Sequence, residues 1–189
     1  MAEAKVIIRG YTNADSAHNS EQESTACTTT LIRDNDVIAL VDLGVMNNQQ
    51  VLKKALNREG LKYEDITHIF LTHSHIDHSR NTGIFPAQIP VVEFWGVWTG
   101  NKVDDWNENF SKNIKIIKTP GHSRDGLTFL VKTDQGVIAV CGDVFWKENY
   151  PDDDPYANDM LELKKSREKI LKIADYIIPG HGDICKVKK

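Results

Sequence analysis

Short apolar runs, most of them rich in β-branched residues, alternate with polar turns along the chain. Such runs are typical of strands, and they predict strands at 5–9, 27–33, 36–42, 66–72, 89–93, 114–118, 126–132, 136–141 and 176–179. The polar stretch 10–24 is a predicted loop, and the run 176–179 is the last predicted strand. Asp34 and Asn35 favour a turn, so the second and third runs form a predicted β-hairpin.

Two segments repeat apolar residues at helical spacing instead. The first, 47–60, ends at Gly60, a residue type that commonly follows a helix, and the second, 160–175, has its apolar residues along one side. Hairpins interspersed with helices predict an α/β chain in which helices cover the sheets. No low-complexity linker interrupts the pattern, and we expect a single domain over 1–189.

Composition mainly excludes classes of protein. The net charge of −4 gives no general attraction to nucleic acid or anionic membranes. No segment is long and apolar enough for a signal peptide or a membrane span. The three cysteines, Cys27, Cys141 and Cys185, lie far apart and outside any C-x-x-C pattern. We therefore expect reduced, mostly buried thiols in a cytoplasmic protein without a membrane partner.

Metal-ligating residue types crowd into one short stretch. Residues 71–78, LTHSHIDH, hold His73, His75, Asp77 and His78 directly after an apolar run. A single histidine is most simply a surface residue, but no packing requirement explains such a cluster. Imidazole nitrogens and carboxylate oxygens are zinc ligands, and a catalytic zinc ion commonly takes three protein ligands plus water. The stretch therefore predicts part of a metal site, with room for a second ion beside the first.

Further ligands are predicted at other strand ends. The tripeptide Pro-Gly-His occurs twice, ending at His122 and at His181, as two related halves around one site would place it. Asp143, in CGDV, also follows a strand-like run. We interpret His68 as a core or sheet-face residue and His18 as a loop residue.

Taken in order, these motifs resemble those of the metallo-β-lactamase-fold hydrolases over nearly the whole chain. VDLG, THSHIDH, TPGH, CGD and PGHG each match a motif of that family, and THSHIDH is highly specific. The short length and the segment ADYIIPGHG are similar to the small stand-alone members of the family. The resemblance implies a four-layer αββα sandwich with a dinuclear zinc site at one edge.

The resemblance also implies a role for each candidate ligand. It implies that the first zinc ion is bound by His73, His75 and His122. The second ion would be bound by Asp77, His78 and His181, and Asp143 would bridge both ions. Asp42, in VDLG, would orient a ligand rather than bind metal. A turn-forming role before Gly44 accounts for Asp42 equally well.

Such a site predicts a hydrolase. Two zinc ions, two carboxylates and a shared hydroxide leave a charge of about +1, which attracts a carboxylate or phosphate group. Water on zinc ionises near neutral pH, and the shared hydroxide is expected to attack an ester, thioester, lactone or amide carbonyl or a phosphoester. Asp77 and Asp143 are the candidate catalytic carboxylates. We expect a small-molecule substrate with an apolar group and an anionic group.

Three other functions remain open. A ribonuclease or phosphodiesterase of the same fold would use the same ligands, although the acidic segment PDDDP and the net charge of −4 disfavour nucleic acid. A persulfide dioxygenase-like oxidoreductase would hold a single iron, which imidazole and carboxylate also suit. The third is a non-catalytic metal-binding protein, although structural zinc normally has four protein ligands.

Aromatic residues gather in two stretches. All four tryptophans lie in 93–110 and 145–160, and Tyr150 and Tyr156 accompany them. These stretches form either the aromatic wall of a substrate pocket or satellite cores beneath long loops, or they make a dimer contact. We accordingly expect a monomer or a homodimer. The three aspartates at 152–154 are interpreted as a solvated turn.

Overall fold

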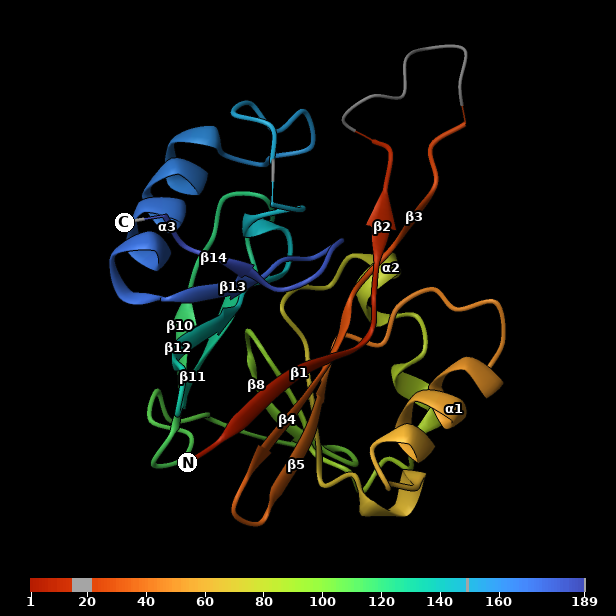
Figure 1. The fold of residues 1–189 in the computed structure, drawn as a ribbon. Helices are drawn as coiled ribbons and strands as arrows, with labels where there is room; N and C mark the ends of the chain where they lie inside the picture. Colours follow the sequence, from red (N-terminus) through yellow and green to blue (C-terminus); the bar gives the residue numbers. More distant parts are fainter. Residues whose placement is uncertain (15–21, 149, 189) are drawn as a thin grey trace.

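Two β-sheets lie face to face between helices in the computed structural model of the chain, which describes residues 1–14, 22–148 and 150–188. Helix α1 (Gln50–Arg58) covers the outer face of one sheet, and α3 (Met160–Ile173) covers the outer face of the other (Figure 1). This four-layer arrangement confirms the predicted α/β class and αββα sandwich. Within these ranges no helix is long and apolar enough to cross a membrane.

The first sheet contains seven strands. In spatial order they are β1 (Glu3–Ile8), β4 (Thr29–Asp34), β5 (Val37–Val41), β6 (His68–Phe70), β7 (Val91–Glu93), β8 (Gly96–Thr99) and β9 (Lys102–Asp104). β6 is parallel to both of its neighbours, and the remaining pairs are antiparallel. Asn35 has a φ of 52° in the tight turn between β4 and β5, which confirms the predicted hairpin.

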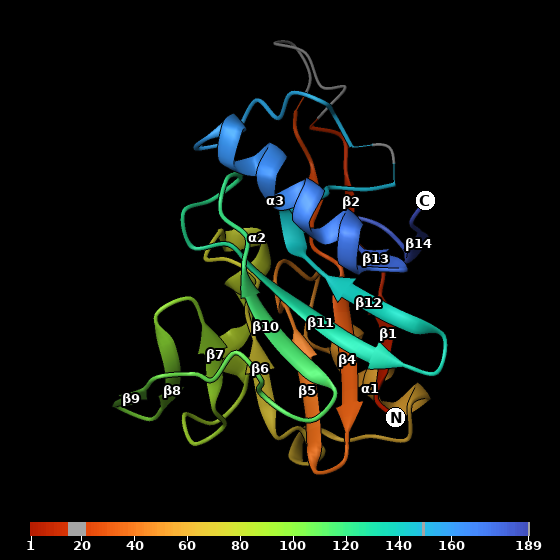
Figure 2. The same cartoon turned by 90° about the vertical axis from the view of Figure 1, so that its left-hand side faces the viewer.

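The second sheet contains five strands. In spatial order they are β10 (Ile114–Lys118), β11 (Leu127–Thr133), β12 (Gly136–Val140), β13 (Tyr176–Ile178) and β14 (Cys185–Lys186). Only the β12–β13 pair among them is parallel. Figure 2 shows β10, β11 and β12 crossing in front of β4 and β5. A separate antiparallel ribbon joins β2 (Tyr11–Thr12) to β3 (Thr25–Ala26).

Helix ends follow local chemistry. Asp159 caps α3 by accepting hydrogen bonds from the backbone N–H groups of Leu161 and Glu162 at 2.9 and 3.0 Å. The chain turns after α1 at Gly60, whose φ of 71° favours glycine. Shorter helical turns in the connections are α2 (Ile76–Ser79) and the 3₁₀ helices η1 (Tyr63–Asp65), η2 (Thr82–Ile84) and η3 (Gly142–Val144).

Apolar side chains hold the layers together. Phe70 of β6 stacks on Phe129 of β11 between the sheets, with ring centroids 4.6 Å apart and ring planes at 14°. Leu52 of α1 and Leu163 of α3 are fully buried in the clusters on the two outer faces. Full burial of such a side chain stabilises the fold by about 1.5–3 kcal/mol. The packed sandwich therefore holds the strand ends, and the loops that follow them, in fixed positions.

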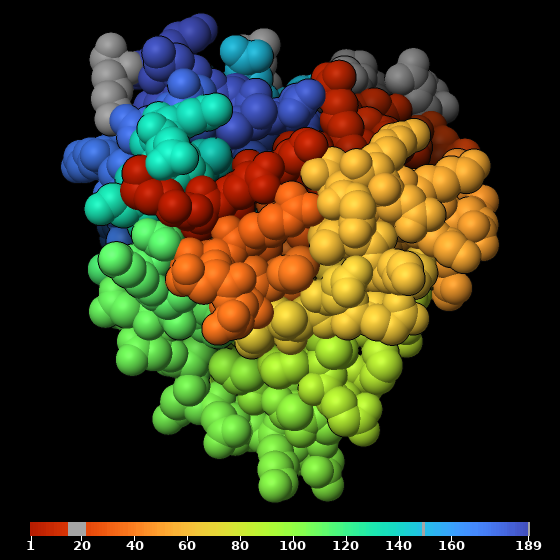
Figure 3. Space-filling view, turned by 60° about the horizontal axis from the view of Figure 1, so that its bottom comes forward, coloured from red at the N-terminus to blue at the C-terminus, as the bar shows by residue number. Residues whose placement is uncertain are grey.

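Sequence prediction was wrong at several sheet edges. The stretch 93–110 contains β8 and β9, which lie in the green segment toward the lower end of Figure 3, and the predicted loop 10–24 contains β2. These peripheral strands mix polar and apolar residues because little of their surface is buried. The run 176–179 is not the last strand, since β14 pairs with β13. His18 lies in 15–21, outside the described residues.

Candidate metal centre

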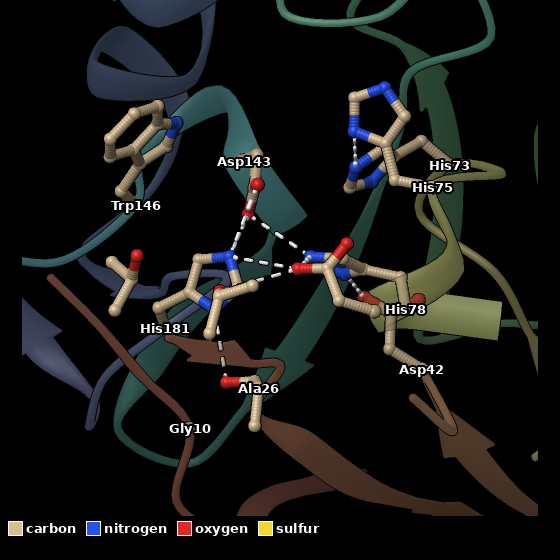
Figure 4. A network of polar contacts seen from close by, with 12 residues as sticks. Gly10, Ala26, Asp42, His73, His75, His78, Asp143, Trp146 and His181 are labelled. Atoms are coloured by element: carbon tan, nitrogen blue, oxygen red, sulfur yellow. Dashed lines mark hydrogen bonds and ion pairs between the residues drawn. The ribbon is translucent and has the colours of Figure 1, made fainter. Parts of the chain in front are cut away.

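The seven predicted ligands meet at one edge of the sandwich, in groups of three and four. The loops that carry them follow β6 (His73, His75, Asp77 and His78), β10 (His122), β12 (Asp143) and β13 (His181). Because β6 runs parallel to β5 and β13 parallel to β12, residues after these strands reach the same edge. Figure 4 shows side chains from both sheets pointing toward one another there.

Three imidazole nitrogens form the first donor group. His75 Nδ1 lies 3.0 Å from His73 Nε2 and 3.1 Å from His122 Nε2. In a tetrahedral zinc site with Zn–N bonds of about 2.0–2.1 Å, two ligand nitrogens lie about 3.3 Å apart. The observed spacing is close to that value, so the first donor group fits one zinc ion.

Two carboxylates and two imidazoles form the second donor group. Asp143 Oδ1 lies 3.3 Å from His78 Nε2 and 3.2 Å from His181 Nε2, and Asp77 Oδ2 lies 3.7 and 3.6 Å from the same two nitrogens. His78 Nε2 and Asp143 Oδ1 are buried and find no hydrogen-bond partner in the described part of the chain. Leaving such atoms unpaired costs about 1–3 kcal/mol each. A cation among these four side chains would remove that cost, so the donors fit a second ion.

Asp143 contacts both groups. Its Oδ2 lies 3.4 Å from His122 Nε2 of the first group and 3.2 Å from His181 Nε2 of the second. The preceding residue, Gly142, has a φ of 50°, and a Cβ there would lie 2.3 Å from Thr72 Oγ1. Glycine at this position therefore lets η3 approach the loop after β6. The Asp143 carboxylate therefore lies between the two donor groups.

Asp42 orients His78, as one of its two interpretations predicts. Asp42 Oδ2 lies 2.8 Å from His78 Nδ1 and accepts a hydrogen bond from Thr72 Oγ1 at 2.7 Å. Asp42 Oδ1 accepts from the backbone N–H of Thr72 at 2.8 Å. A carboxylate on Nδ1 places the proton there and leaves Nε2 of His78 free to bind a metal. Asp42 also has a φ of 58°, so the turn-forming interpretation applies to the same residue.

His122 is oriented by a residue that sequence analysis assigned to a solvated turn. Asp154 Oδ2 lies 2.7 Å from His122 Nδ1 and accepts from Trp146 Nε1 at 3.2 Å. The solvated-turn interpretation is wrong for Asp154, which is buried, and holds for the exposed Asp152 and Asp153. A run of three aspartates gives no signal that the third turns inward.

The charges of the second donor group reinforce one another. Burial alone would lower the pKa of His78, but the carboxylates of Asp143 and Asp42 outweigh it and raise that pKa well above its usual value. Burial alone would raise the pKa of Asp143, but His78 and His181 hold it well below its usual value. Burial lowers the pKa of His73 well below its usual value and that of His75 as well, which favours their neutral imidazole forms. Only neutral imidazoles and ionised carboxylates bind metal, so a cation entering the second donor group would displace the proton that the carboxylates favour on His78.

The donors open onto a pocket of about 280 Å³. Its lining residues, besides the metal donors, are Thr12, Ala14, Glu23, Thr25, Trp146 and Tyr156. His181 Nδ1 lies 3.0 Å from the carbonyl oxygen of Ala26, so the β2–β3 ribbon both walls the pocket and orients a donor (Figure 4).

The two aromatic stretches have different roles. Trp146 and Tyr156, from 145–160, stack with centroids 5.9 Å apart and line the pocket, as the pocket-wall interpretation predicts. That interpretation is wrong for 93–110, because none of the described lining residues comes from it, and its Trp95 is 72% exposed. His68 is a sheet-face residue, as expected: its ring lies edge-on to an aromatic ring at 5.3 Å.

Comparison with known proteins agrees with the fold. The family model of the metallo-beta-lactamase superfamily matches residues 24–97. The chain is 28% identical over 194 residues to metallo-beta-lactamase domain-containing protein 1 of Xenopus laevis, covering 97% of this chain and 81% of that protein. It is 26% identical over 170 residues to an N-acyl homoserine lactonase of Bacillus cereus, covering 75% of this chain and 68% of that protein. A candidate metallo-beta-lactamase from Thermotoga maritima has a similar structure, with a TM-score of 0.71, 18% identity and coverage of 98% and 99%.

In sequence and in fold the chain therefore resembles the metallo-β-lactamase superfamily, and the resemblance found in its motifs is confirmed. The Thermotoga structure shares the αββα sandwich over nearly the full length of both chains. The chain spans 58% to 61% of the length of the mouse, rat and human relatives that carry the same name as the Xenopus protein.

Proposed function

We propose that this chain is a dinuclear zinc hydrolase that cleaves an ester- or lactone-type carbonyl in a small, largely apolar substrate. The observation that supports this most is Asp143, which lies between a group of three imidazoles and a group containing two more, beside a pocket of about 280 Å³. The Bacillus cereus relative is named a lactonase, which supports the enzyme class, a metal-dependent hydrolase.

The chain's own residues would hold the ions and handle the proton. When bound, zinc lowers the pKa of water towards about 7 and polarises the carbonyl under attack. The imidazoles of His73, His75 and His122 present lone pairs to the first ion. Asp77 is the least buried member of the second group and lines the pocket, so its carboxylate can accept a proton during turnover.

The chemistry of the wall supports the substrate class. The stacked rings of Trp146 and Tyr156 offer an apolar surface beside the donors. The described lining residues include no lysine or arginine, so an anionic group on the substrate would have to reach the ions themselves. Nucleic-acid binding depends on basic residues that contact phosphates. The wall therefore favours a carbonyl substrate over a polynucleotide.

Zinc-loaded protein assayed on an ester, a thioester, an N-acyl lactone, a phosphodiester and a β-lactam tests the proposal. We expect turnover of the ester or lactone, and a loss of at least about 100-fold in kcat/KM for Asp143→Asn. Asp134→Asn, an exposed change in the β11–β12 turn, is the matched control and should leave kcat/KM unchanged. Turnover of the phosphodiester alone, or full activity of metal-loaded Asp143→Asn, would contradict the proposal.

Metal analysis separates the zinc hydrolase from the oxidoreductase alternative. We expect two zinc ions per chain in protein purified without added metal. One iron and no zinc would instead favour the persulfide dioxygenase-like function, because imidazole and carboxylate donors accept iron as well.

A further inference from the structure

We propose that Asp154 is a positioning residue of the metal centre, holding His122 for the first ion and Trp146 in the pocket wall with a single carboxylate. The proposal rests on the metal centre described above. Asp154 Oδ2 lies 2.7 Å from His122 Nδ1 and 3.2 Å from Trp146 Nε1, and Oδ1 accepts from the backbone N–H of Tyr156 at 2.8 Å. One side chain thus joins a metal donor to both aromatic residues of the wall.

The contact determines which nitrogen of His122 carries the proton. An ionised carboxylate only accepts hydrogen bonds, so Nδ1 of His122 must donate, and Nε2 keeps its lone pair. That nitrogen lies 3.1 Å from His75 Nδ1, inside the first donor group. His75 presents the opposite nitrogen, Nδ1, to the same group. The structure therefore assigns His122 the Nδ1–H form and His75 the Nε2–H form in the metal-loaded protein.

Asp154 is itself held in place. Its side chain is fully buried, and the segment before it is anchored to α3 by Arg167. The Arg167 guanidinium donates to the carbonyl oxygens of Val144 at 2.9 Å and of Pro151 and Asp152 at 3.1 Å each. A buried carboxylate that accepts several hydrogen bonds, directly after an anchored segment, has little freedom to move. This is the condition for orienting a metal ligand.

Zinc titration of two neighbouring variants tests the proposal. Asp154→Asn is nearly isosteric but replaces one acceptor oxygen by a donor, whereas Asp153→Asn removes the same charge one residue away, where the side chain is 88% exposed. With a chromophoric chelator as competitor, we expect Asp154→Asn to weaken the first zinc site about 10- to 100-fold. We expect Asp153→Asn to stay within about twofold of the wild type, and Asp154→Glu to recover part of the loss.

The fluorescence of Trp146 provides a second readout. The other tryptophans lie in 93–110, away from the pocket, so Trp146→Phe identifies the signal that belongs to Trp146. We expect zinc to change this emission in the wild type and in Asp153→Asn, but less in Asp154→Asn, where the indole loses its acceptor. Equal zinc responses in Asp154→Asn and the wild type would contradict the shared role of the carboxylate.

Nitrogen-15 NMR of the histidines in zinc-loaded wild type tests the same assignment without any variant. His122 in the Nε2–H form would overturn the proposal, even if Asp154→Asn failed to fold. Unchanged zinc affinity in Asp154→Asn would also overturn it. So would an equal loss of affinity at both zinc sites together with a lower Tm of the metal-free protein, because that result indicates a merely structural role. Failure of the wild type to bind zinc would instead reject the metal centre itself.

Discussion

Gly180 faces Asp143 so closely that a Cβ at position 180 would lie 1.8 Å from Asp143 Oδ1. The backbone N–H of Gly180 also donates to the carbonyl oxygen of Gly142 at 2.9 Å, which ties the loop after β13 to the loop after β12. Only a residue without a side chain allows this approach. The glycine before His181 is therefore what lets Asp143 reach both donor groups.

Gly180→Ala should damage the metal centre before it damages the fold. The added methyl group must displace the Asp143 carboxylate, and overpacking of this kind costs about 1–3 kcal/mol. We expect zinc affinity at the second donor group to fall at least about tenfold, measured by chelator competition. Gly83→Ala is the control, because a Cβ there meets nothing within 4 Å. Wild-type zinc affinity in Gly180→Ala would show that Asp143 does not need this position.

Asp42→Ala should destabilise even the metal-free protein. It removes the acceptor of Thr72 and of His78 in a buried environment, and breaking a buried charge pair from one side costs about 3–5 kcal/mol. Asp42→Asn keeps one acceptor oxygen and suits the positive φ, so its loss should be smaller. Urea unfolding in the presence of a chelator measures the free energy of unfolding of both variants. Asp183→Ala, an exposed change, should stay within about 0.5 kcal/mol, and a similarly small effect of Asp42→Ala would refute the orienting role.

The convergence of the seven candidate donors could be predicted from sequence because metal-ligand chemistry restricts where such residues can stand. Ligands of one ion must be close along the chain, as in 71–78, or must follow strands that end at the same edge, as His122 and His181 do. The strand-like runs before these donors indicate that each of them follows a strand.

Asp154 could not be predicted, because its role depends on contacts distant in sequence. Its partner His122 lies on the loop after β10, and Arg167 of α3 holds the segment before it. Nothing in the run of three aspartates indicates either interaction. The same reason separates Trp146 from Trp95: composition places tryptophan in both stretches, but only the tertiary structure shows which stretch reaches the donors.

Asp34 should make the stability of the protein sensitive to acid. Burial alone would raise the pKa of Asp34, but hydrogen bonds from Ser111 and Asn113 lower it below its usual value. A carboxylate whose pKa is lowered by folding stabilises the native state above its unfolded pKa of about 3.9. That contribution is lost as the pH falls through the lower, folded pKa. Asp34→Asn should therefore lose part of the acid dependence of the free energy of unfolding.

Urea unfolding of metal-free protein from about pH 5 down to about pH 2 measures this difference, because the contribution is lost below the unfolded pKa. Asp36→Asn, an exposed change in the same turn, should follow the wild-type pH dependence. An identical pH dependence in Asp34→Asn and the wild type would mean that the hydrogen bonds to Ser111 and Asn113 do not favour the ionised form.

Cys27 should be inert as a thiol in the native protein. Burial raises the pKa of Cys27 to about 12, so its reactive thiolate is scarce at pH 8. Differential alkylation with iodoacetamide, read by mass spectrometry, should leave Cys27 and the buried Cys141 unmodified, label the half-buried Cys185 slowly, and label all three in urea. A thiol whose pKa is raised by folding stabilises the native state below its unfolded pKa of about 8.5, and the contribution is lost as the pH rises towards the folded value. Cys27→Ala should therefore weaken the loss of stability at alkaline pH. In the alkylation experiment, rapid labelling of Cys27 in the native protein would show that the thiol is not buried in solution.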